Sequence, residues 1–324
     1  MSPFASALIA WQRRHGRHGL PWQGTRDPYR VWLSEVMLQQ TQVAAVIPYY
    51  ERFLAKYPDV KALAAASEDD VLRLWSGLGY YARGRNLHAA AKELASKGFP
   101  RTPEKIQGLP GVGRSTAAAI AVFAFGKRAA ILDGNVKRVL ARQFDLSEES
   151  QLWKKAESLL PKKSIEAYTQ ALMDLGATVC VRKQPRCERC PVRAACVARK
   201  EDRIAELPAP RPKKVIPLIK TTWYIFLRGA EVLLERRPGK GVWGGLWTFP
   251  ETRLYRTAKP RVLPTIEHGF THFRLRVRPL LCELKKKQPG TAAPGCLWID
   301  VADAVAAAVP TPVKRVLERL AAGT

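Results

Sequence analysis

A proline-rich segment divides the sequence into two parts with different hydrophobic patterns. The run Leu207-Pro-Ala-Pro-Arg-Pro-Lys-Lys-Val-Ile-Pro217 cannot form a helix, because proline lacks the backbone N–H and clashes with the preceding turn. So many prolines predict a semi-rigid linker. We therefore expect an all-α domain over residues 1–206, a linker over residues 207–218 and a smaller α+β domain over residues 219–324.

Apolar residues recur at a spacing of three to four before the linker, as they do in amphipathic helices. Three of the expected helices follow residues that favour helix N-termini, namely Ser67, Asp133 and Ser147. The pattern predicts helices over residues 4–14, 29–40, 43–56, 68–75, 84–97, 114–125, 136–144, 148–160 and 164–180. Beyond the linker it predicts strands over residues 221–227, 231–235 and 275–284, and a terminal helix over residues 301–322.

The sequence is strongly basic, with 54 Lys and Arg against 28 Asp and Glu and a formal net charge of +26. This excess favours a polyanionic partner over a merely solvated basic surface. Nucleic acid is favoured over membrane, because no basic amphipathic tail stands out. With 47% hydrophobic residues the chain can bury a core, which excludes a disordered chain.

No uninterrupted apolar run approaches the roughly 18–20 residues that a membrane span needs. The N-terminal apolar patch, residues 4–11, is followed by its basic residues, whereas a secretory signal has them first. We therefore expect a soluble, cytoplasmic protein without a membrane partner, associated with the nucleoid if it is bacterial.

Four of the six cysteines lie within 17 residues: Cys180, Cys187, Cys190 and Cys196. An intracellular setting disfavours structural disulfides, so we expect these thiolates to surround one metal centre. Zinc is a candidate, although zinc sites more often use two separated Cys pairs or include His. The irregular close spacing favours one 4Fe-4S cluster held by the four thiolates.

The segment Leu109-Pro-Gly-Val-Gly113 precedes a helix of small residues. Gly111 and Gly113 permit a tight turn whose N–H groups face an anion, with a helix N-terminus behind them. Because a short helix over residues 103–107 precedes this turn, the segment predicts a helix-hairpin-helix, which holds duplex DNA by its phosphates without reading the base sequence. Taken alone, Gly-Val-Gly also fits an ordinary turn.

Two carboxylates are candidates for catalysis. Glu35 lies in the middle of an expected helix, beside apolar neighbours such as Val31, Trp32 and Leu38. Desolvation on such a face raises the pKa of a carboxyl group and suits a general acid, although a surface glutamate fits the sequence equally well. Asp133 precedes a helix, where a carboxylate can cap the backbone and also face a developing positive charge.

A protonated Glu beside an ionised Asp is the arrangement that breaks glycosidic bonds through an oxocarbenium-like transition state. In a DNA-binding protein the corresponding bond joins a base to deoxyribose. The base must first leave the stack, and another group must fill the gap. The segments 39–41 and 77–83 offer polar and aromatic side chains for this purpose.

Several long motifs occur together in this chain. They are Trp32-Leu-Ser-Glu-Val-Met-Leu-Gln-Gln-Thr-Gln42, Gly77-Leu-Gly-Tyr-Tyr-Ala-Arg83, Leu109-Pro-Gly-Val-Gly-Arg-Ser-Thr116, Ile131-Leu-Asp-Gly-Asn-Val-Lys-Arg-Val-Leu-Ala-Arg142 and the four-cysteine spacing. Together they resemble the adenine DNA glycosylase (MutY) family of the helix-hairpin-helix glycosylase superfamily. Two further segments look like that family's C-terminal domain: Trp243-Gly-Gly-Leu-Trp-Thr-Phe-Pro-Glu251 and His268-Gly-Phe-Thr-His-Phe273.

The resemblance implies an all-α helix-hairpin-helix glycosylase domain with an iron–sulfur cluster loop, followed by a smaller α+β Nudix-like domain. It also implies a monomeric base-excision-repair enzyme, an N-glycosyl hydrolase that removes adenine mispaired with 8-oxoguanine, or with guanine, from double-stranded DNA. Glu35 would protonate the adenine at N7 and later help to activate water. Asp133 would stabilise the sugar cation, with Asn135 supporting it.

Further roles follow from the same resemblance. The positions that match the adenine pocket are Trp22, Gln23, Leu38, Val43, Ser115 and Asp174. The positions that match DNA and 8-oxoguanine recognition are Gln40, Thr41, Tyr80, Gly111, Gly113, Lys137, Phe270, Thr271 and His272.

Three departures refine these expectations. Relatives that also cut the strand carry Lys where this chain has Ser115, and serine cannot form a Schiff base, so we expect a monofunctional enzyme. Family members commonly have Ser where Thr271 stands, which keeps the hydroxyl and adds a methyl group. The Nudix reaction needs a glutamate-rich magnesium-binding helix, and only eight acidic residues follow residue 210, so we interpret this domain as a lesion-recognition module.

Two alternatives make different demands on the sequence. A pyrimidine glycosylase with lyase activity predicts Lys at position 115 and no second domain. A non-catalytic DNA-binding scaffold has no need of Glu35 on an apolar face.

Overall fold

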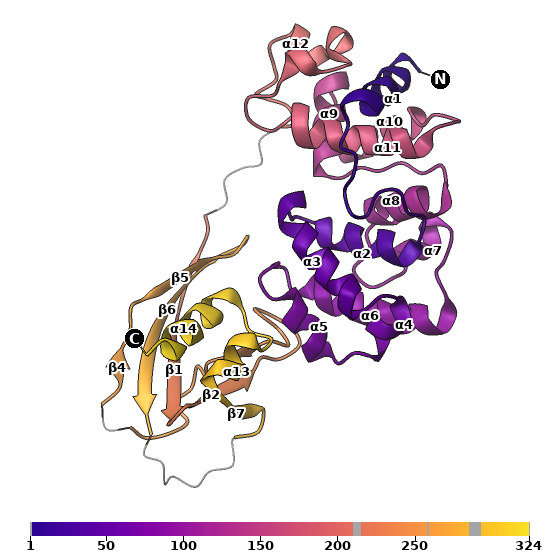
Figure 1. Cartoon of the computed structure of the whole chain (residues 1–324). Helices are drawn as coiled ribbons and strands as arrows, with labels where there is room; N and C mark the ends of the chain where they lie inside the picture. The colour runs from indigo at the N-terminus through magenta and orange to yellow at the C-terminus, as the bar shows by residue number, and fades with distance from the viewer. Residues whose placement is uncertain (1, 210–214, 258, 285–292, 324) are drawn as a thin grey trace. The chain divides into compact units, whose positions relative to one another are not determined.

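The protein is described by a computed structural model that covers residues 2–209, 215–257, 259–284 and 293–323 (Figure 1). The chain forms two compact units. The first comprises Met1–Ala64 and Ala89–Pro212, and the second comprises Ala65–His88 and Lys213–Thr324. Residues 210–214 of the predicted linker lie outside the described residues, and Leu218 already begins a strand. The domain boundaries given above therefore stay a prediction.

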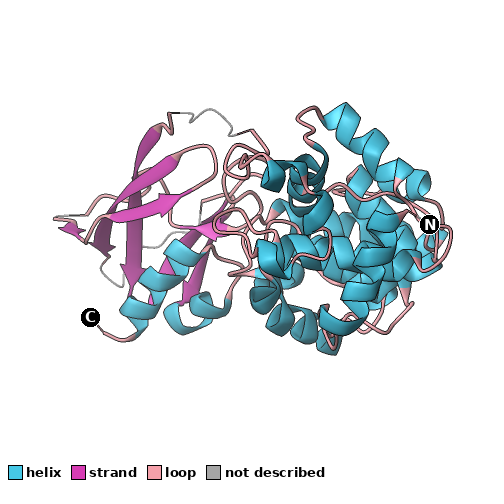
Figure 2. Cartoon of the chain, turned by 90° about the horizontal axis from the view of Figure 1, so that it is seen from above, coloured by secondary structure: helices cyan, strands magenta, loops and turns pink. Residues whose placement is uncertain are grey.

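The first unit is helical (Figure 2). Its helices are α1 (Pro3–His15), α2 (Pro28–Leu38), α3 (Val43–Lys56), α7 (Pro103–Gln107), α8 (Arg114–Phe125), α9 (Gly134–Phe144), α10 (Glu149–Ser158), α11 (Ile165–Asp174) and α12 (Val197–Lys200). Two helices cross the limits of the units, α4 (Val60–Ala65) and α6 (Ala82–Lys97), and α5 (Glu68–Trp75) belongs to the second unit. Short helical turns over Leu175–Val179, Cys187–Arg189 and Arg193–Ala195 complete the region around the cysteines.

The core of this unit forms where α1, α8, α9 and α11 pack together around Leu8, Val122, Leu140 and Leu172. Helix α8 is rich in alanine, and its buried small side chains let neighbouring helices approach closely. Helix α2 packs against α8, and α9 packs against the turn that follows α11. This packing brings Glu35 on α2 close to Asp133, which caps α9.

The described residues of the second unit form a seven-stranded sheet in the order β3-β2-β1-β6-β4, with β7 also pairing β2 and β5 also pairing β6. The strands are β1 (Leu218–Arg228), β2 (Glu231–Arg236), β3 (Trp247–Thr248), β4 (Arg261–Val262), β5 (Ile266–Gly269), β6 (Arg274–Glu283) and β7 (Cys296–Asp300). Strands β1 and β6 are parallel and the other pairs are antiparallel. Helices α13 (Val301–Ala306) and α14 (Thr311–Ala321) lie on one face of the sheet (Figure 1).

Several local predictions are wrong in instructive ways. The terminal helix expected over residues 301–322 is two helices, because Pro310 and Pro312 cannot continue a helix and instead begin the second one. The helix expected over residues 164–180 is α-helical only to Asp174 and continues as a π-turn. The N-cap of α10 is Glu148 and not Ser147. The fold class, all-α followed by α+β, is confirmed.

None of the helices in the described ranges combines the length and apolarity that crossing a bilayer requires.

Candidate active site

Glu35 lies on the face of α2 that borders a cavity in the first unit. Its neighbours along the helix, including Val31, Trp32 and Val36, are buried. Burial, as the larger cause, and the negative charge of nearby Asp133 together raise the pKa of the Glu35 carboxyl group from 4.5 to about 8. Glu35 is therefore a carboxylic acid that keeps its proton at neutral pH, which the apolar helix pattern predicts.

Asp133 is held by the backbone at the start of α9. Its Oδ1 accepts hydrogen bonds from the backbone N–H of Asn135 at 2.6 Å and of Val136 at 2.9 Å. These donors and the N-terminus of the helix stabilise negative charge at this position. The structure thus brings a protonated acid and a capped carboxylate together, although 98 residues separate them in the sequence.

The cavity beside Glu35 has a volume of about 620 Å³, which is in the range of small-molecule sites. Four of the predicted pocket residues line it: Trp22, Gln23, Leu38 and Val43. Arg17, Ser34 and Phe123 also contribute to its wall, among other residues. Trp22 packs edge-on against Tyr50, with ring centroids 5.4 Å apart. The cavity therefore joins an acid to aromatic, apolar and amide side chains.

The other two predicted pocket residues, Ser115 and Asp174, form hydrogen bonds to segments that carry residues of the site. The Ser115 hydroxyl accepts a hydrogen bond from the backbone N–H of Leu132 at 2.9 Å, immediately before Asp133. Asp174 is fully buried, and its carboxylate accepts hydrogen bonds from the backbone N–H of Arg17 at 2.9 Å and from the Arg17 Nε at 2.7 Å.

Gln23 also holds the segment that begins at Arg17. Its amide accepts a hydrogen bond from the Leu20 N–H and donates one to the Arg17 carbonyl, both at 3.0 Å. Asp174 and Gln23 therefore fix a segment that lines the cavity. Arg17 was not among the sequence candidates, because nothing local in the sequence indicates its pairing with an aspartate 157 residues away.

The predicted helix-hairpin-helix is present as α7, a turn and α8. Gly111 has a φ of +75°, a conformation that favours glycine, and Gly113 is the N-cap of α8. In the described residues no side chain caps this helix, so the N–H groups of its first turn are available to an anion. Gln39 braces the turn by donating hydrogen bonds to the Gly111 carbonyl and to the Thr116 hydroxyl, both at 3.3 Å.

Two arginines of α9 link Asn135 to the cysteine segment. The Arg138 guanidinium donates to the Asn135 side-chain oxygen at 2.8 Å, to the Gly176 carbonyl at 2.7 Å and to the Cys180 carbonyl at 2.7 Å. Arg142, only 4% exposed, donates to the carbonyls of Val181 and Arg182 and to the Cys180 Sγ at 3.5 Å.

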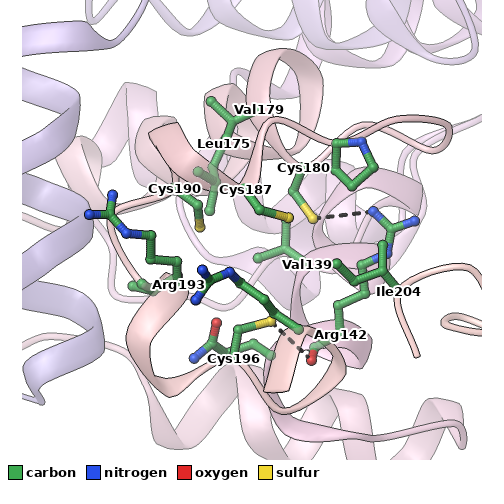
Figure 3. Close-up of a pocket in the computed structure, with 14 residues that line it drawn as sticks. Val139, Arg142, Leu175, Val179, Cys180, Cys187, Cys190, Arg193, Cys196 and Ile204 are labelled. Carbon is green, nitrogen blue, oxygen red and sulfur yellow. Dashed lines mark hydrogen bonds between the residues drawn. The ribbon is translucent and has the colours of Figure 1, made fainter. Parts of the chain in front are cut away.

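All four clustered cysteines line one pocket, and their side chains point into a common space (Figure 3). In the described part of the chain, no group of three or more His, Cys, Asp or Glu side chains is arranged to hold a metal ion. Burial and the neighbouring thiols raise the pKa of Cys187, Cys190 and Cys196, in the case of Cys190 to about 11. A bound cation would relieve this repulsion between thiolates. The four thiols are thus chemically suited to a shared metal centre, although in the structure they are not arranged as a metal-binding group.

The second unit holds four of the predicted recognition residues, Tyr80, Phe270, Thr271 and His272. Tyr80 follows α5, is 49% exposed, and its hydroxyl lies 3.4 Å from the Thr271 hydroxyl. Thr271 and His272 stand in a turn closed by a hydrogen bond from the Phe270 N–H to the Phe273 carbonyl at 2.9 Å. The rings of Phe270 and Phe273 stack at 4.4 Å.

Three predicted DNA contacts lie elsewhere in the first unit. Gln40 is exposed and has a φ of +56°, and the Thr41 hydroxyl donates to the Gln39 carbonyl at 3.3 Å. The Lys137 ammonium lies one turn after Asp133 and pairs with Glu149 at 2.7 Å.

The comparisons with known proteins agree with this geometry. A family profile described as "HhH-GPD superfamily base excision DNA repair protein" matches residues 33–162, and one described as "NUDIX domain" matches residues 221–319. A solved structure titled as that of a thermostable thymine-DNA glycosylase superposes with a TM-score of 0.57 at 29% identity, covering 61% of this chain and 95% of that one. The fold and the site thus define a base-excision DNA glycosylase of the helix-hairpin-helix class with an added Nudix-like domain.

Full-length relatives narrow the class to one family. "Adenine DNA glycosylase" of Buchnera aphidicola subsp. Baizongia pistaciae (strain Bp) is 34% identical over 339 residues, covering 98% of this chain and 96% of the relative. The Homo sapiens protein of the same description is 34% identical over 402 residues, covering 98% of this chain and 73% of the relative. The chain belongs to the adenine DNA glycosylase family, as the sequence motifs predict.

Proposed function

We propose that this protein removes adenine mispaired with 8-oxoguanine, and with guanine, from double-stranded DNA by hydrolysing the N-glycosidic bond. The observation that carries this proposal is Glu35, an acid that keeps its proton at neutral pH, facing a cavity of about 620 Å³ and standing close to Asp133. The relatives' description names adenine and DNA. The net charge of +26 suits a polyanionic substrate.

The reaction needs a proton donor for the leaving base and a negative charge beside the sugar. Glu35 donates its proton to N7 of the adenine, which leaves as a neutral base while the bond electrons stay with it. The deoxyribose becomes oxocarbenium-like, and the Asp133 carboxylate stabilises that positive charge. Asn135 supports Asp133 at the start of α9, where its backbone N–H donates a hydrogen bond to the Asp133 carboxylate. The Glu35 carboxylate then accepts a proton from the water that attacks the sugar, which restores the acid.

The adenine must leave the helix to reach this cavity. Trp22, Gln23, Leu38 and Val43 are proposed to surround the extruded base, while Ser115 and Asp174 brace the cavity wall. The N–H groups of the hairpin at Gly111 and Gly113 bind phosphate without reading sequence. Gln40, Thr41 and Tyr80 are proposed to enter the stack, and Lys137 to bind phosphate in place of its partner Glu149.

The opposite base is proposed to be read by the turn of Phe270, Thr271 and His272. The support for this role is the short distance between the hydroxyl groups of Thr271 and Tyr80, which would place both beside the same nucleotide. The Thr271 hydroxyl can donate or accept a hydrogen bond, so it can distinguish 8-oxoguanine from guanine at the atoms where they differ. A Thr271→Ala variant should lose preference for the oxidised base, while Thr271→Ser should keep it.

We propose one 4Fe-4S cluster as the metal centre of Cys180, Cys187, Cys190 and Cys196. When bound, such a cluster joins the loop segments through four iron–thiolate bonds. Zinc is the alternative for the same donors. The purified protein should show broad visible absorption and contain iron, whereas a colourless, zinc-containing protein would exclude the cluster.

Ser115 supports a monofunctional enzyme. A glycosylase that also cuts the strand uses an amine to form a Schiff base with the sugar, and a hydroxyl group cannot do so. We expect the product strand to remain intact until it is treated with alkali.

The test is single-turnover release of adenine from a duplex containing one A·8-oxoguanine pair. The wild-type protein should release free adenine, while Glu35→Gln and Asp133→Asn should each be slower by at least about a hundredfold. Glu93→Gln makes the same chemical change at an exposed position of α6 and should match the wild type. Release by Glu35→Gln at the wild-type rate would contradict the assigned mechanism.

A further inference from the structure

Arg83, in the second unit, has a buried side chain. Arg83 is only 8% exposed. It lies in the first turn of α6, which follows the segment Gly77–Tyr81. A buried guanidinium group is costly, and burial lowers the Arg83 pKa to about 10. Proteins retain such groups where their hydrogen bonds and their planar face hold other groups in place.

The guanidinium group of Arg83 contacts both the backbone and the aromatic side chains of this segment. Its Nη2 donates hydrogen bonds to the Leu78 carbonyl at 3.3 Å and to the Gly79 carbonyl at 3.2 Å. Its central carbon lies 5.4 Å from the ring centroids of both Trp75 and Tyr80, within the range of cation–π attraction. Trp75 adds a hydrogen bond from its indole N–H to the Gly79 carbonyl at 3.0 Å.

Tyr80 stands in an unfavourable backbone conformation. Its φ is +47°, in the left-handed region that aromatic residues rarely adopt, and its ring is largely outside the core. Such a conformation persists only where the surroundings enforce it, and strained residues of this kind concentrate at functional sites. The groups that enforce it here are the Arg83 hydrogen bonds to the two preceding carbonyls and the contact between the guanidinium group and the Tyr80 ring.

We propose that Arg83 is a positioning residue that holds Tyr80 in the conformation in which it enters the base stack beside the mismatch. This inference rests on the proposed function and adds a residue to it. We expect Arg83 itself to touch no nucleotide, because its side chain is buried and its Nη2 donates to protein carbonyls. Its effect on the reaction must therefore pass through Tyr80.

The experiment compares Arg83→Gln, Arg83→Lys, Tyr80→Leu and the double variant Tyr80→Leu/Arg83→Gln with the wild type. Arg73→Gln is the matched control, since it removes an exposed arginine whose partner is Asp70 in the same unit. On the A·8-oxoguanine duplex, Arg83→Gln should release adenine about tenfold more slowly than the wild type, as expected when a charge-assisted hydrogen bond is lost. Arg83→Lys should recover only part of the rate, because an ammonium group has no plane to stack on a ring.

Two readouts distinguish positioning from general damage to the fold. If Arg83 acts through Tyr80, the double variant should be no slower than Tyr80→Leu alone. On a duplex with adenine opposite an abasic site, where no base needs to be displaced from that strand, Arg83→Gln should be close to the wild type. A rate loss of equal size on both substrates, or multiplication of the two single losses in the double variant, would overturn the inference.

A third readout does not depend on catalysis. Fluorescence of 2-aminopurine next to the mismatch rises when the stack is opened, and it should rise with wild type and Arg73→Gln but not with Tyr80→Leu or Arg83→Gln. If the wild type opens the stack without releasing adenine and Arg83→Gln does not open it, the proposed function is contradicted while this role of Arg83 is supported. An equal rise with Arg83→Gln and the wild type would overturn the role of Arg83.

Discussion

Replacing Glu35 with glutamine should make the protein more stable at neutral pH. The pKa of Glu35 is raised from 4.5 to about 8 in the folded protein, so between these values the unfolded chain releases a proton that the folded protein keeps. The unfolded state is favoured accordingly, and the free energy of unfolding falls as the pH rises through this window. Glutamine has nearly the same shape and no proton to release.

The magnitude follows from the same two pKa values. Each pH unit above 4.5 costs about 1.4 kcal/mol, so Glu35 destabilises the fold by about 3 kcal/mol at pH 7 and about 5 kcal/mol at pH 8 and above. Below pH 4.5 the carboxyl group is protonated in both states and the cost vanishes. Glu35→Gln should therefore gain about 3 kcal/mol at pH 7 and nothing at pH 4.5.

Urea unfolding at several pH values, followed by tryptophan fluorescence, measures this difference. With a denaturant slope of about 3 kcal/mol/M, the midpoint of Glu35→Gln should lie about 1 M above that of the wild type at pH 7. Glu93→Gln, at an exposed position, should show no such pH-dependent gain. Equal midpoints for Glu35→Gln and wild type at pH 7, or a gain that stays constant from pH 5 to pH 8, would refute the reasoning.

Three further substitutions test other parts of the site. Asp133→Asn should keep the melting temperature within a few degrees but release adenine at least about a hundredfold more slowly. The reason is that asparagine still caps a helix but bears no charge. A large loss of stability would show that the carboxylate is mainly structural. Arg142→Gln should lower the free energy of unfolding by about 3 kcal/mol, because it leaves buried carbonyls and the Cys180 sulfur without a donor. The control Arg13→Gln, at an exposed position, should not lower it. Equal urea midpoints for Arg142→Gln and the wild type would contradict this. Gly176→Ala should cost about 1–3 kcal/mol and slow adenine release, because the new Cβ would lie 2.7 Å from the Asn135 Cβ; unchanged melting and activity would show that the turn can yield.

The sequence predicts the catalytic pair because each member has a local signature. Glu35 follows from apolar neighbours on one helix face, and Asp133 follows from its place before a helix. The structure supplies their proximity, which depends on the tertiary packing of the helices and has no local signal. The helix-hairpin-helix is equally local, because the two glycines and the flanking helices are adjacent in the chain.

The residues that sequence reasoning missed act over long separations. Arg142 reaches the carbonyl of Leu207, 65 residues away, and Arg17 reaches Asp174, 157 residues away. Arg138 and Arg142 follow Asp133 by one and two helical turns, so they could have been noticed as basic residues on the helix that begins at the site. Arg83 was visible only as the last residue of a motif, and its burial depends on how Gly77–Tyr81 folds back on α6.

The fold, like the site, is predicted where the sequence signal is local and missed where it depends on distant contacts. The boundaries of α3, α5 and α8 match the predicted ranges because their apolar spacing is regular. Strands β3 and β4 have two residues each, too few to show an alternating pattern, and β7 pairs with β2, which is distant in the sequence. The grouping of residues 65–88 with the C-terminal unit likewise depends on tertiary contacts.

The central claim is that Glu35 supplies a proton to the departing adenine, and the pH dependence of single-turnover adenine release tests it most directly. The rate of the wild-type protein should be independent of pH well below 8 and should fall about tenfold per pH unit well above it, because the carboxyl group loses its proton as the pH passes its pKa of about 8. A rate that stays constant from pH 7 to pH 10, on a duplex that remains saturated with protein, would contradict the account.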